Sequence, residues 1–240
     1  MFFPMFYSPG YLVVMVIGFA LLGFSSMYVK RTYRRWSGIR NSTGLTGAQV
    51  AQQVLASAGL SNVRVEVVDG ELSDNYDPTD KVLHLSQGVA YNASVASEAI
   101  VAHEIGHAVQ DARGFAPMRL RAGVLPAANI GGQLGVTMII IGLVLMTVLR
   151  GLSALGFNIA VLGLVLFSCV LVFQLVTLPV ELDASRRAMG LLRTNGIVNQ
   201  EDIHGARSVL TAAALTYVAA TAYTALQVAY WGLQVFSRRD

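Results

Sequence analysis

Charged residues are scarce in this chain. Asp, Glu, Lys and Arg make up 13% of its 240 residues, against roughly a quarter in soluble domains. Hydrophobic residues make up 54%, and the charges are confined to particular stretches. This distribution is typical of a chain that has a lipid bilayer as solvent over part of its length. The composition therefore predicts an integral membrane protein.

Cysteine is almost absent, since Cys169 is the only one. An intrachain disulfide and a zinc site with several cysteine ligands are therefore excluded. Cys169 lies in an apolar run and is expected to pack as a small hydrophobic residue. The net charge of +3 is small, and no nucleic-acid-binding module is visible.

Four apolar runs are candidates for crossing the bilayer, which takes roughly 20 residues. They cover 11–29, 133–149, 154–180 and 208–237. The last run is rich in Ala, Thr and Tyr, which suits packing between helices, so a re-entrant or interfacial helix is its alternative. The expected segments are an anchor (1–29), an α+β domain (30–130), a transmembrane hairpin (131–180), a polar helix (181–208) and a last membrane helix (209–240).

The basic residues near the ends of these runs predict an orientation. The side predicted to be cytoplasmic has eleven: Lys30, Arg31, Arg34, Arg35, Arg40, Arg119, Arg121, Arg186, Arg187, Arg193 and Arg207. The opposite side has only Arg150, Arg238 and Arg239. By the positive-inside rule, the polar region therefore faces the cytoplasm.

The polar region has the pattern of a small α+β domain. Thr46 is a good N-cap for a helix through about Ala58, and Ser94 for a helix over about 95–112. Alternating residues in 63–68 and 82–85, with a turn cluster at 75–80, predict a small sheet.

The second of these helices carries the run His103-Glu104-Ile105-Gly106-His107. Residues four apart lie on one helical face, so both imidazoles can reach one Zn²⁺. Glu104, beside them, could take a proton from a water molecule activated by the metal. The pattern predicts a zinc-dependent hydrolase.

Catalytic zinc usually has three protein ligands. A third histidine six residues after His107 is excluded, because position 113 is Arg. Glu181 is the best-placed candidate, since a carboxylate at the membrane edge needs a partner. The alternatives are Glu201, His204 and nearby aspartates, principally Asp183.

The zinc motif and the run 179–188 (Pro-Val-Glu-Leu-Asp-Ala-Ser-Arg-Arg-Ala) resemble the YugP-type bacterial membrane zinc metallopeptidases. The likeness extends to 72–78, 82–86 and 215–219, and a more distant one is to gluzincins of the HtpX and CAAX-protease kind. It implies a gluzincin-like domain with Glu181 as zinc ligand. The relatives' aspartate that orients a ligand histidine is matched here by Ser185, which could take that role, as could Asp183 or another group.

The resemblance also implies that the stretch 82–86 is a sheet edge that binds the substrate backbone as an added strand. Its residues are Val82, Leu83, His84, Leu85 and Ser86. His84 is expected to be a surface or edge residue rather than a ligand. Tyr217 could stabilise the oxyanion if the last apolar run reaches the site, with packing between helices as its alternative.

The expected protein is therefore a mainly α, multi-pass membrane zinc endopeptidase, with about four transmembrane helices and one Zn²⁺ per chain. It would lie in the bacterial cytoplasmic membrane, with its active site facing the cytoplasm, and would cleave membrane or unfolded polypeptides. The alternative is a non-catalytic scaffold stapled by zinc. A transporter is disfavoured because Arg150 is the only charge in 133–180. A homo-oligomer or membrane-protein partners remain open.

Overall fold

The computed structural model describes residues 9–238 and divides them into two compact units. The helical unit contains 9–24, 119–177 and 217–238, and the α+β unit contains 25–118 and 178–216. The first eight residues of the predicted anchor, together with Arg239, lie outside the described residues, and the side chain of Arg150 is not described.

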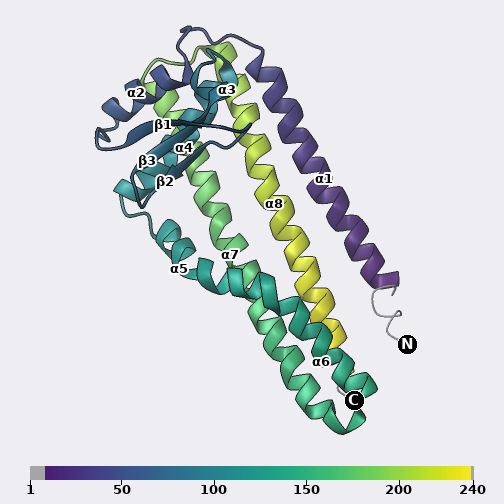
Figure 1. The fold of residues 1–240 in the computed structure, drawn as a ribbon. Helices are drawn as coiled ribbons and strands as arrows, with labels where there is room; N and C mark the ends of the chain where they lie inside the picture. The colour runs from purple at the N-terminus through teal and green to yellow at the C-terminus, as the bar shows by residue number, and fades with distance from the viewer. Residues whose placement is uncertain (1–8, 239–240) are drawn as a thin grey trace. The chain divides into compact units, whose positions relative to one another are not determined.

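The long helices confirm the mainly α, membrane-protein fold class. They are α1 (Pro9–Ser37), α5 (Ala116–Ile130), α6 (Val136–Val148), α7 (Ser153–Thr194) and α8 (Gln200–Phe236), labelled in Figure 1. A π-helical stretch, Gly131–Gly135, joins α5 to α6, and a 3₁₀ turn, Arg150–Leu152, precedes α7. Within 9–238, four helical segments are long and apolar enough to cross a membrane: Pro9–Ser37, Ala116–Val148, Ser153–Thr194 and Gln200–Phe236.

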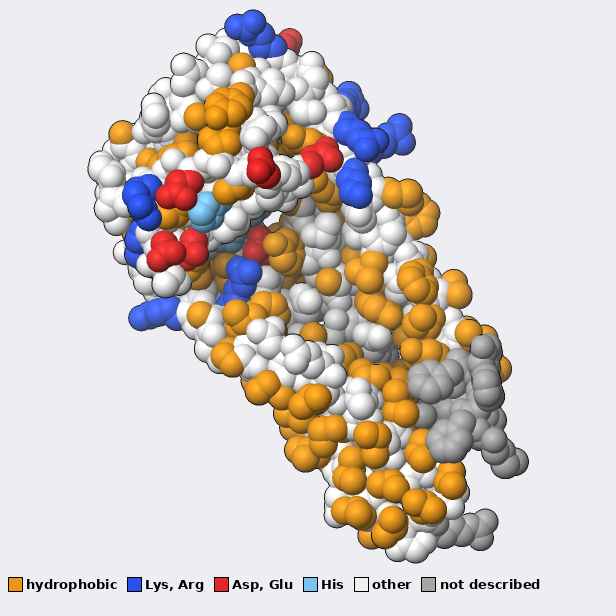
Figure 2. Space-filling model, in the orientation of Figure 1, with side chains coloured by type: hydrophobic (Ala, Val, Ile, Leu, Met, Phe, Trp, Pro, Cys, Tyr) orange, Lys and Arg blue, Asp and Glu red, His pale blue; other side chains and the backbone are white. Residues whose placement is uncertain are grey.

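The helical unit is held together by close contact between backbones. A Cβ atom added to Gly156 would lie 2.6 Å from the carbonyl oxygen of Gly142, and one added to Gly163 would lie 2.7 Å from that of Gly135. Glycine at these positions lets α7 pack directly against the helix before it, as small residues do in membrane bundles. The face of this unit visible in Figure 2 is covered largely by hydrophobic side chains, as expected for contact with lipid.

The α+β unit contains α2 (Gly47–Ser57), β1 (Arg64–Val68), β2 (Asn75–Asp77), β3 (Val82–Ser86), α3 (Gln87–Ala90) and α4 (Val95–Ala112). Both predicted N-caps are confirmed. The hydroxyl of Thr46 accepts the N–H of Gln49 in a capping box, and the hydroxyl of Ser94 accepts the N–H of Ser97.

The sheet has the order β1-β3-β2, with β1 parallel and β2 antiparallel to β3. The stretch 82–86 is therefore the central strand, and its expected position at the sheet edge is wrong. Asn75–Asp77 had been assigned to a turn because it is short and polar, yet it forms the strand that covers β3. His84 is accordingly half-buried in the middle of the sheet.

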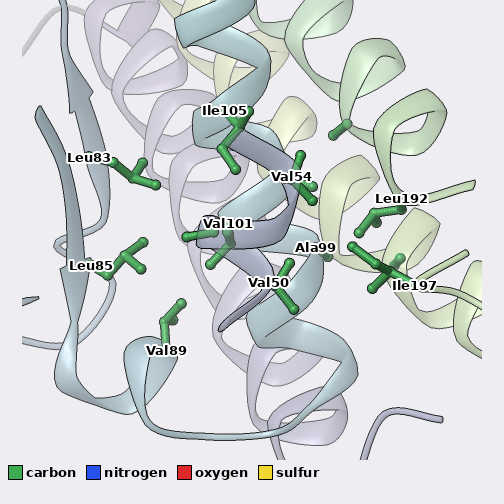
Figure 3. Close-up of a cluster of buried hydrophobic side chains, with 14 of the residues drawn as sticks. Val50, Val54, Leu83, Leu85, Val89, Ala99, Val101, Ile105, Leu192 and Ile197 are labelled. Carbon is green, nitrogen blue, oxygen red and sulfur yellow. The ribbon is translucent and has the colours of Figure 1, made fainter. Parts of the chain in front are cut away.

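Helix α4 forms the centre of the hydrophobic core of this unit (Figure 3). Its Val101 and Ile105 lie between Leu83 and Leu85 of β3 on one side and Val54 of α2 on the other. All five side chains are fully buried. Because the buried face of α4 is fixed from both sides, the direction of its remaining side chains is fixed too.

The expected polar helix 181–208 is divided between two longer helices. Residues 181–194 are the end of α7, which continues from the apolar run, and 200–208 are the start of α8. The turn between them contains Gly196, whose φ of +64° is accessible to glycine at little cost.

Candidate metal centre

Helix α4 presents the two histidines of the motif side by side. Four residues complete slightly more than one turn, so His103 and His107 project from neighbouring positions on one face. Their ring centroids lie 4.8 Å apart. His107 is buried and His103 half-buried, so the pair is largely shielded from solvent.

Glu181, in the last third of α7, completes the group. Its Oε2 lies 3.3 Å from Nε2 of His103 and 3.5 Å from Nε2 of His107. The candidate ligand atoms of the three residues all lie within 4.8 Å of one another. Glu181 is 2% exposed, so its carboxylate depends on the two histidines, or on an ion shared with them, for its polar contacts at this point.

The close approach of α4 and α7 depends on Gly106. A Cβ atom at this position would lie 2.6 Å from the carbonyl oxygen of Ala184, one turn after Glu181. Any larger residue would therefore separate the two helices that supply the ligands.

The hydrogen bonds of Gln110 determine the tautomer of His107. The amide nitrogen of Gln110 donates to the carbonyl oxygen of Val180 (2.8 Å) and to Oδ2 of Asp183 (2.9 Å). Both partners are acceptors, so the amide oxygen must be the atom 3.0 Å from Nδ1 of His107, and Nδ1 carries the proton. Nε2, which faces Glu181, is then left with a free lone pair for a metal.

Ser185 makes the corresponding contact to the other histidine. Its hydroxyl lies 3.2 Å from Nδ1 of His103. Among the groups considered for orienting a ligand histidine, Ser185 therefore contacts His103 directly, whereas Asp183 reaches His107 only through Gln110.

The donor set fits zinc. Two imidazole nitrogens and one carboxylate oxygen are the ligands found in many catalytic zinc sites, and the second nitrogen of each ring is already hydrogen-bonded, as in such sites. The other ligands considered lie elsewhere among the described residues. Asp183 pairs with Arg187, His204 lies against the Trp36 ring, and Glu201 is exposed.

Glu104 is held by strand β2. Its Oε2 accepts the backbone N–H of Tyr76 at 3.0 Å. The Tyr76 hydroxyl donates to Asp111 of α4 (2.7 Å), and Lys81 also pairs with Asp111. Burial raises the pKa of the Glu104 carboxyl above its usual range, although the neighbouring histidines oppose this. Strand β2 is thus bound to α4 through Asp111, and it orients Glu104 of the same helix.

Comparison with known proteins agrees with this geometry. Residues 11–236 match a protein family described as "Putative neutral zinc metallopeptidase". The chain belongs to this zinc metallopeptidase family. It is also similar to the "Putative membrane protease YugP" of Bacillus subtilis (strain 168), at 35% identity over 224 residues, covering 92% of this chain and 96% of the relative. No solved structure matches the chain.

Two residues at this metallopeptidase centre could not be recognised from the sequence as contacts of the site. Gln110 is fully buried beside the ligands, although a polar residue near the end of a helix is equally compatible with a position facing solvent. Tyr76 lies in the run 72–78 that carried part of the resemblance, but its contact with Glu104 is made by the backbone and leaves no signature in the side chain.

Two predicted contributions stay predictions. Val82, Leu83, His84, Leu85 and Ser86 do not offer a free edge, because β1 and β2 flank this strand and the N–H of Ser86 is bonded to Asp74. Their contact with a substrate is untested. Tyr217 lies on α8 in the helical unit, and its role at an oxyanion is likewise untested.

Proposed function

We propose that this chain is a membrane zinc endopeptidase that hydrolyses peptide bonds of membrane or unfolded proteins near the cytoplasmic face of the bilayer. One observation carries the proposal: His103, His107 and Glu181 converge at ligand distance, with Glu104 next to the first histidine. A donor set of this kind, with an adjacent carboxylate, suits hydrolysis better than a purely structural site.

The residues of the site have separate roles. His103, His107 and Glu181 would hold the zinc ion, and Gln110 and Ser185 fix the orientation of the two rings. When bound, zinc supplies Lewis acidity, which polarises a carbonyl group and lowers the pKa of a water molecule.

Glu104 acts as the general base and then as the general acid. One carboxylate oxygen is kept in place by the Tyr76 N–H, and the other is left to take a proton from the attacking water. As the C–N bond breaks, Glu104 returns this proton to the departing amine. The water oxygen remains on the new carboxyl product, so the reaction consumes one water for each bond cleaved.

Metal analysis combined with a proteolysis assay tests the proposal. In Glu104→Ala, zinc content should be unchanged while cleavage of an unfolded substrate falls roughly 100-fold or more, the usual contribution of a general base. In Glu181→Ala, zinc itself should be lost. Glu66→Ala is the matched control, because Glu66 is an exposed residue of β1. Activity surviving in Glu104→Ala would refute the mechanism, and full zinc occupancy in Glu181→Ala would refute the ligand assignment.

The same experiment separates the endopeptidase from a zinc-stapled scaffold. A scaffold would bind zinc in the native chain and in Glu104→Ala alike, and neither protein would cleave the substrate.

The cytoplasmic orientation rests on the distribution of basic residues and is tested by labelling intact cells. With Cys169 replaced by Ser, cysteine is introduced either as Ser57→Cys in the α+β unit or as Gly151→Cys in the link before α7. A thiol reagent that cannot cross membranes should label the Gly151→Cys chain only. Labelling of the Ser57→Cys chain in intact cells would place the site on the outside.

A further inference from the structure

The start of α4 carries a second group of buried oxygen-bearing side chains, none of which is among the three zinc ligands. Glu98 lies in the first turn of α4, Asp202 in the first turn of α8, and Asn41 in the loop that follows α1. Their exposed fractions are 0%, 5% and 3%. Two carboxylates at this depth are unusual, because buried charges are normally paired or bound to metal.

Hydrogen bonds bring the three residues into one neighbourhood. The backbone N–H of Glu98 and the amide nitrogen of Asn41 both approach the carbonyl oxygen of Ser94, at 3.1 and 3.4 Å. The next residue after Asn41, Ser42, donates its N–H to Oδ2 of Asp202 at 3.0 Å. Side chains of a helix lean towards its N-terminus, so the Glu98 carboxylate leans towards this meeting point.

The group offers acceptors without matching donors. Both carboxylate oxygens of Glu98 and Oδ1 of Asn41 are buried and have no hydrogen-bond partner within residues 9–238. Burial and the nearby charge of Asp202 raise the pKa of Glu98 to about 8. Buried acceptors left in this way call for a specific explanation, such as a bound ion.

Apolar side chains pack beside this group. Around the start of α8, the ring of Trp36 and the side chain of Val95 pack against Gly205, where an added Cβ would lie 2.5–2.6 Å from them. This apolar packing closes the group from one side and strengthens any electrostatic interaction inside it.

We propose that Asn41, Glu98 and Asp202 bind a hard divalent cation, Ca²⁺ or Mg²⁺, at a site separate from the zinc centre. Carboxylate and amide oxygens are the ligands that these ions prefer, and no histidine or cysteine is among the three residues, which disfavours zinc. The ion would tie the loop after α1 and the start of α8 to the first turn of α4, five residues before His103. Its role is therefore to stabilise the helix that carries the zinc motif.

The experiment uses the full chain in detergent, loaded with zinc, at pH 8, with Ca²⁺ or Mg²⁺ added separately after other divalent ions have been removed. A cation at about 100 times its dissociation constant should raise the melting temperature by roughly 5–10 °C. The Glu98→Gln variant keeps the shape of the side chain and should lose this rise. Glu66→Gln, which removes an exposed carboxylate from the same unit, should keep it.

Tb³⁺ luminescence gives a direct readout of binding, because Trp36 contacts Gly205 of α8 and can transfer energy to an ion held nearby. The signal should appear in the native chain, decrease on addition of the ion that raised the melting temperature, and be absent in Glu98→Gln. Asp202→Asn should weaken it, which provides a second variant if Glu98→Gln fails to fold.

Two results would overturn the proposal. The first is an unchanged melting temperature of the native chain with both ions, which would leave a protonated Glu98 as the explanation of the unpartnered oxygens. The second is an equal rise in the native chain and in Glu98→Gln, which would place the ion elsewhere. None of these measurements uses proteolysis, so they are independent of the proposed catalytic function.

Discussion

Replacing Gly106 by Ala should weaken zinc binding although no ligand is changed. The added Cβ would lie 2.6 Å from the carbonyl oxygen of Ala184 and 3.2 Å from its carbonyl carbon and Cα. All three are backbone atoms of α7, so no side-chain rotation can relieve the contact.

The size of the effect follows from this geometry. Ordinary van der Waals contact begins at 3.4 Å, so α4 and α7 must separate locally by about 0.8 Å. Zinc–ligand distances tolerate deviations of roughly 0.2 Å, so Glu181 can no longer meet both histidines at full strength. Overpacking of this kind costs about 1–3 kcal/mol, which corresponds to a loss of zinc affinity of roughly 5-fold to 150-fold.

Competition with a chromogenic chelator measures the affinity, and thermal unfolding measures the stability. Gly190→Ala is the matched control, since Gly190 lies on α7 with nothing within 4 Å of an added Cβ. There the substitution should keep zinc affinity and raise stability by about 0.5–1 kcal/mol, because glycine is unfavourable in a helix interior. If Gly106→Ala bound zinc as tightly as Gly190→Ala, the direct contact of the two helices at the site would be refuted.

Three further outcomes are expected. Gln110→Ala should lower zinc affinity roughly 10-fold to 100-fold in the chelator assay, because the ring of His107 loses its orientation; Gln53→Ala, which removes an exposed amide, should not. Ser185→Ala should have a smaller effect in the same assay, because a single contact is lost, and a larger effect than that of Gln110→Ala would contradict this ranking. The third outcome concerns pH in a buffer from which divalent ions have been removed by a chelator. The pKa of Glu98 is about 8 in the folded chain and about 4.5 in the unfolded chain. The protonated Glu98 therefore contributes its full stabilisation below about pH 4.5, and this stabilisation is lost as the pH rises through 8. Denaturant unfolding from pH 5 to 9 should show a decline of about 4 kcal/mol in the native chain and a flatter profile in Glu98→Gln; equal profiles would exclude Glu98 as the titrating group.

The sequence predicted the parts of the site that depend on local spacing. Helical periodicity alone brings His103, Glu104 and His107 together, and Ser94 marks the start of their helix. Glu181 could be identified because a carboxylate at the end of an apolar run needs a partner, and the resemblance pointed to the same residue.

The remaining contacts depend on tertiary structure and leave no local signal. Gln110 is buried because its partners, Val180 and Asp183, come from a helix 70 and 73 positions away. The sheet order was mispredicted for a similar reason. Tyr76 pairs through its backbone, and a three-residue strand has too few residues to show an alternating pattern.

The separation of the metal ligands along the chain has a consequence for folding. His103 and Glu181 are 78 positions apart, and an ion bound to both closes a loop of that length. By the loop-closure relation for cross-links, a loop of this length lowers the conformational entropy of the unfolded chain by the equivalent of about 4.5 kcal/mol at 25 °C. Metal loading is therefore linked to folding as well as to chemistry: where zinc is scarce, the folded population of this chain should fall together with its activity.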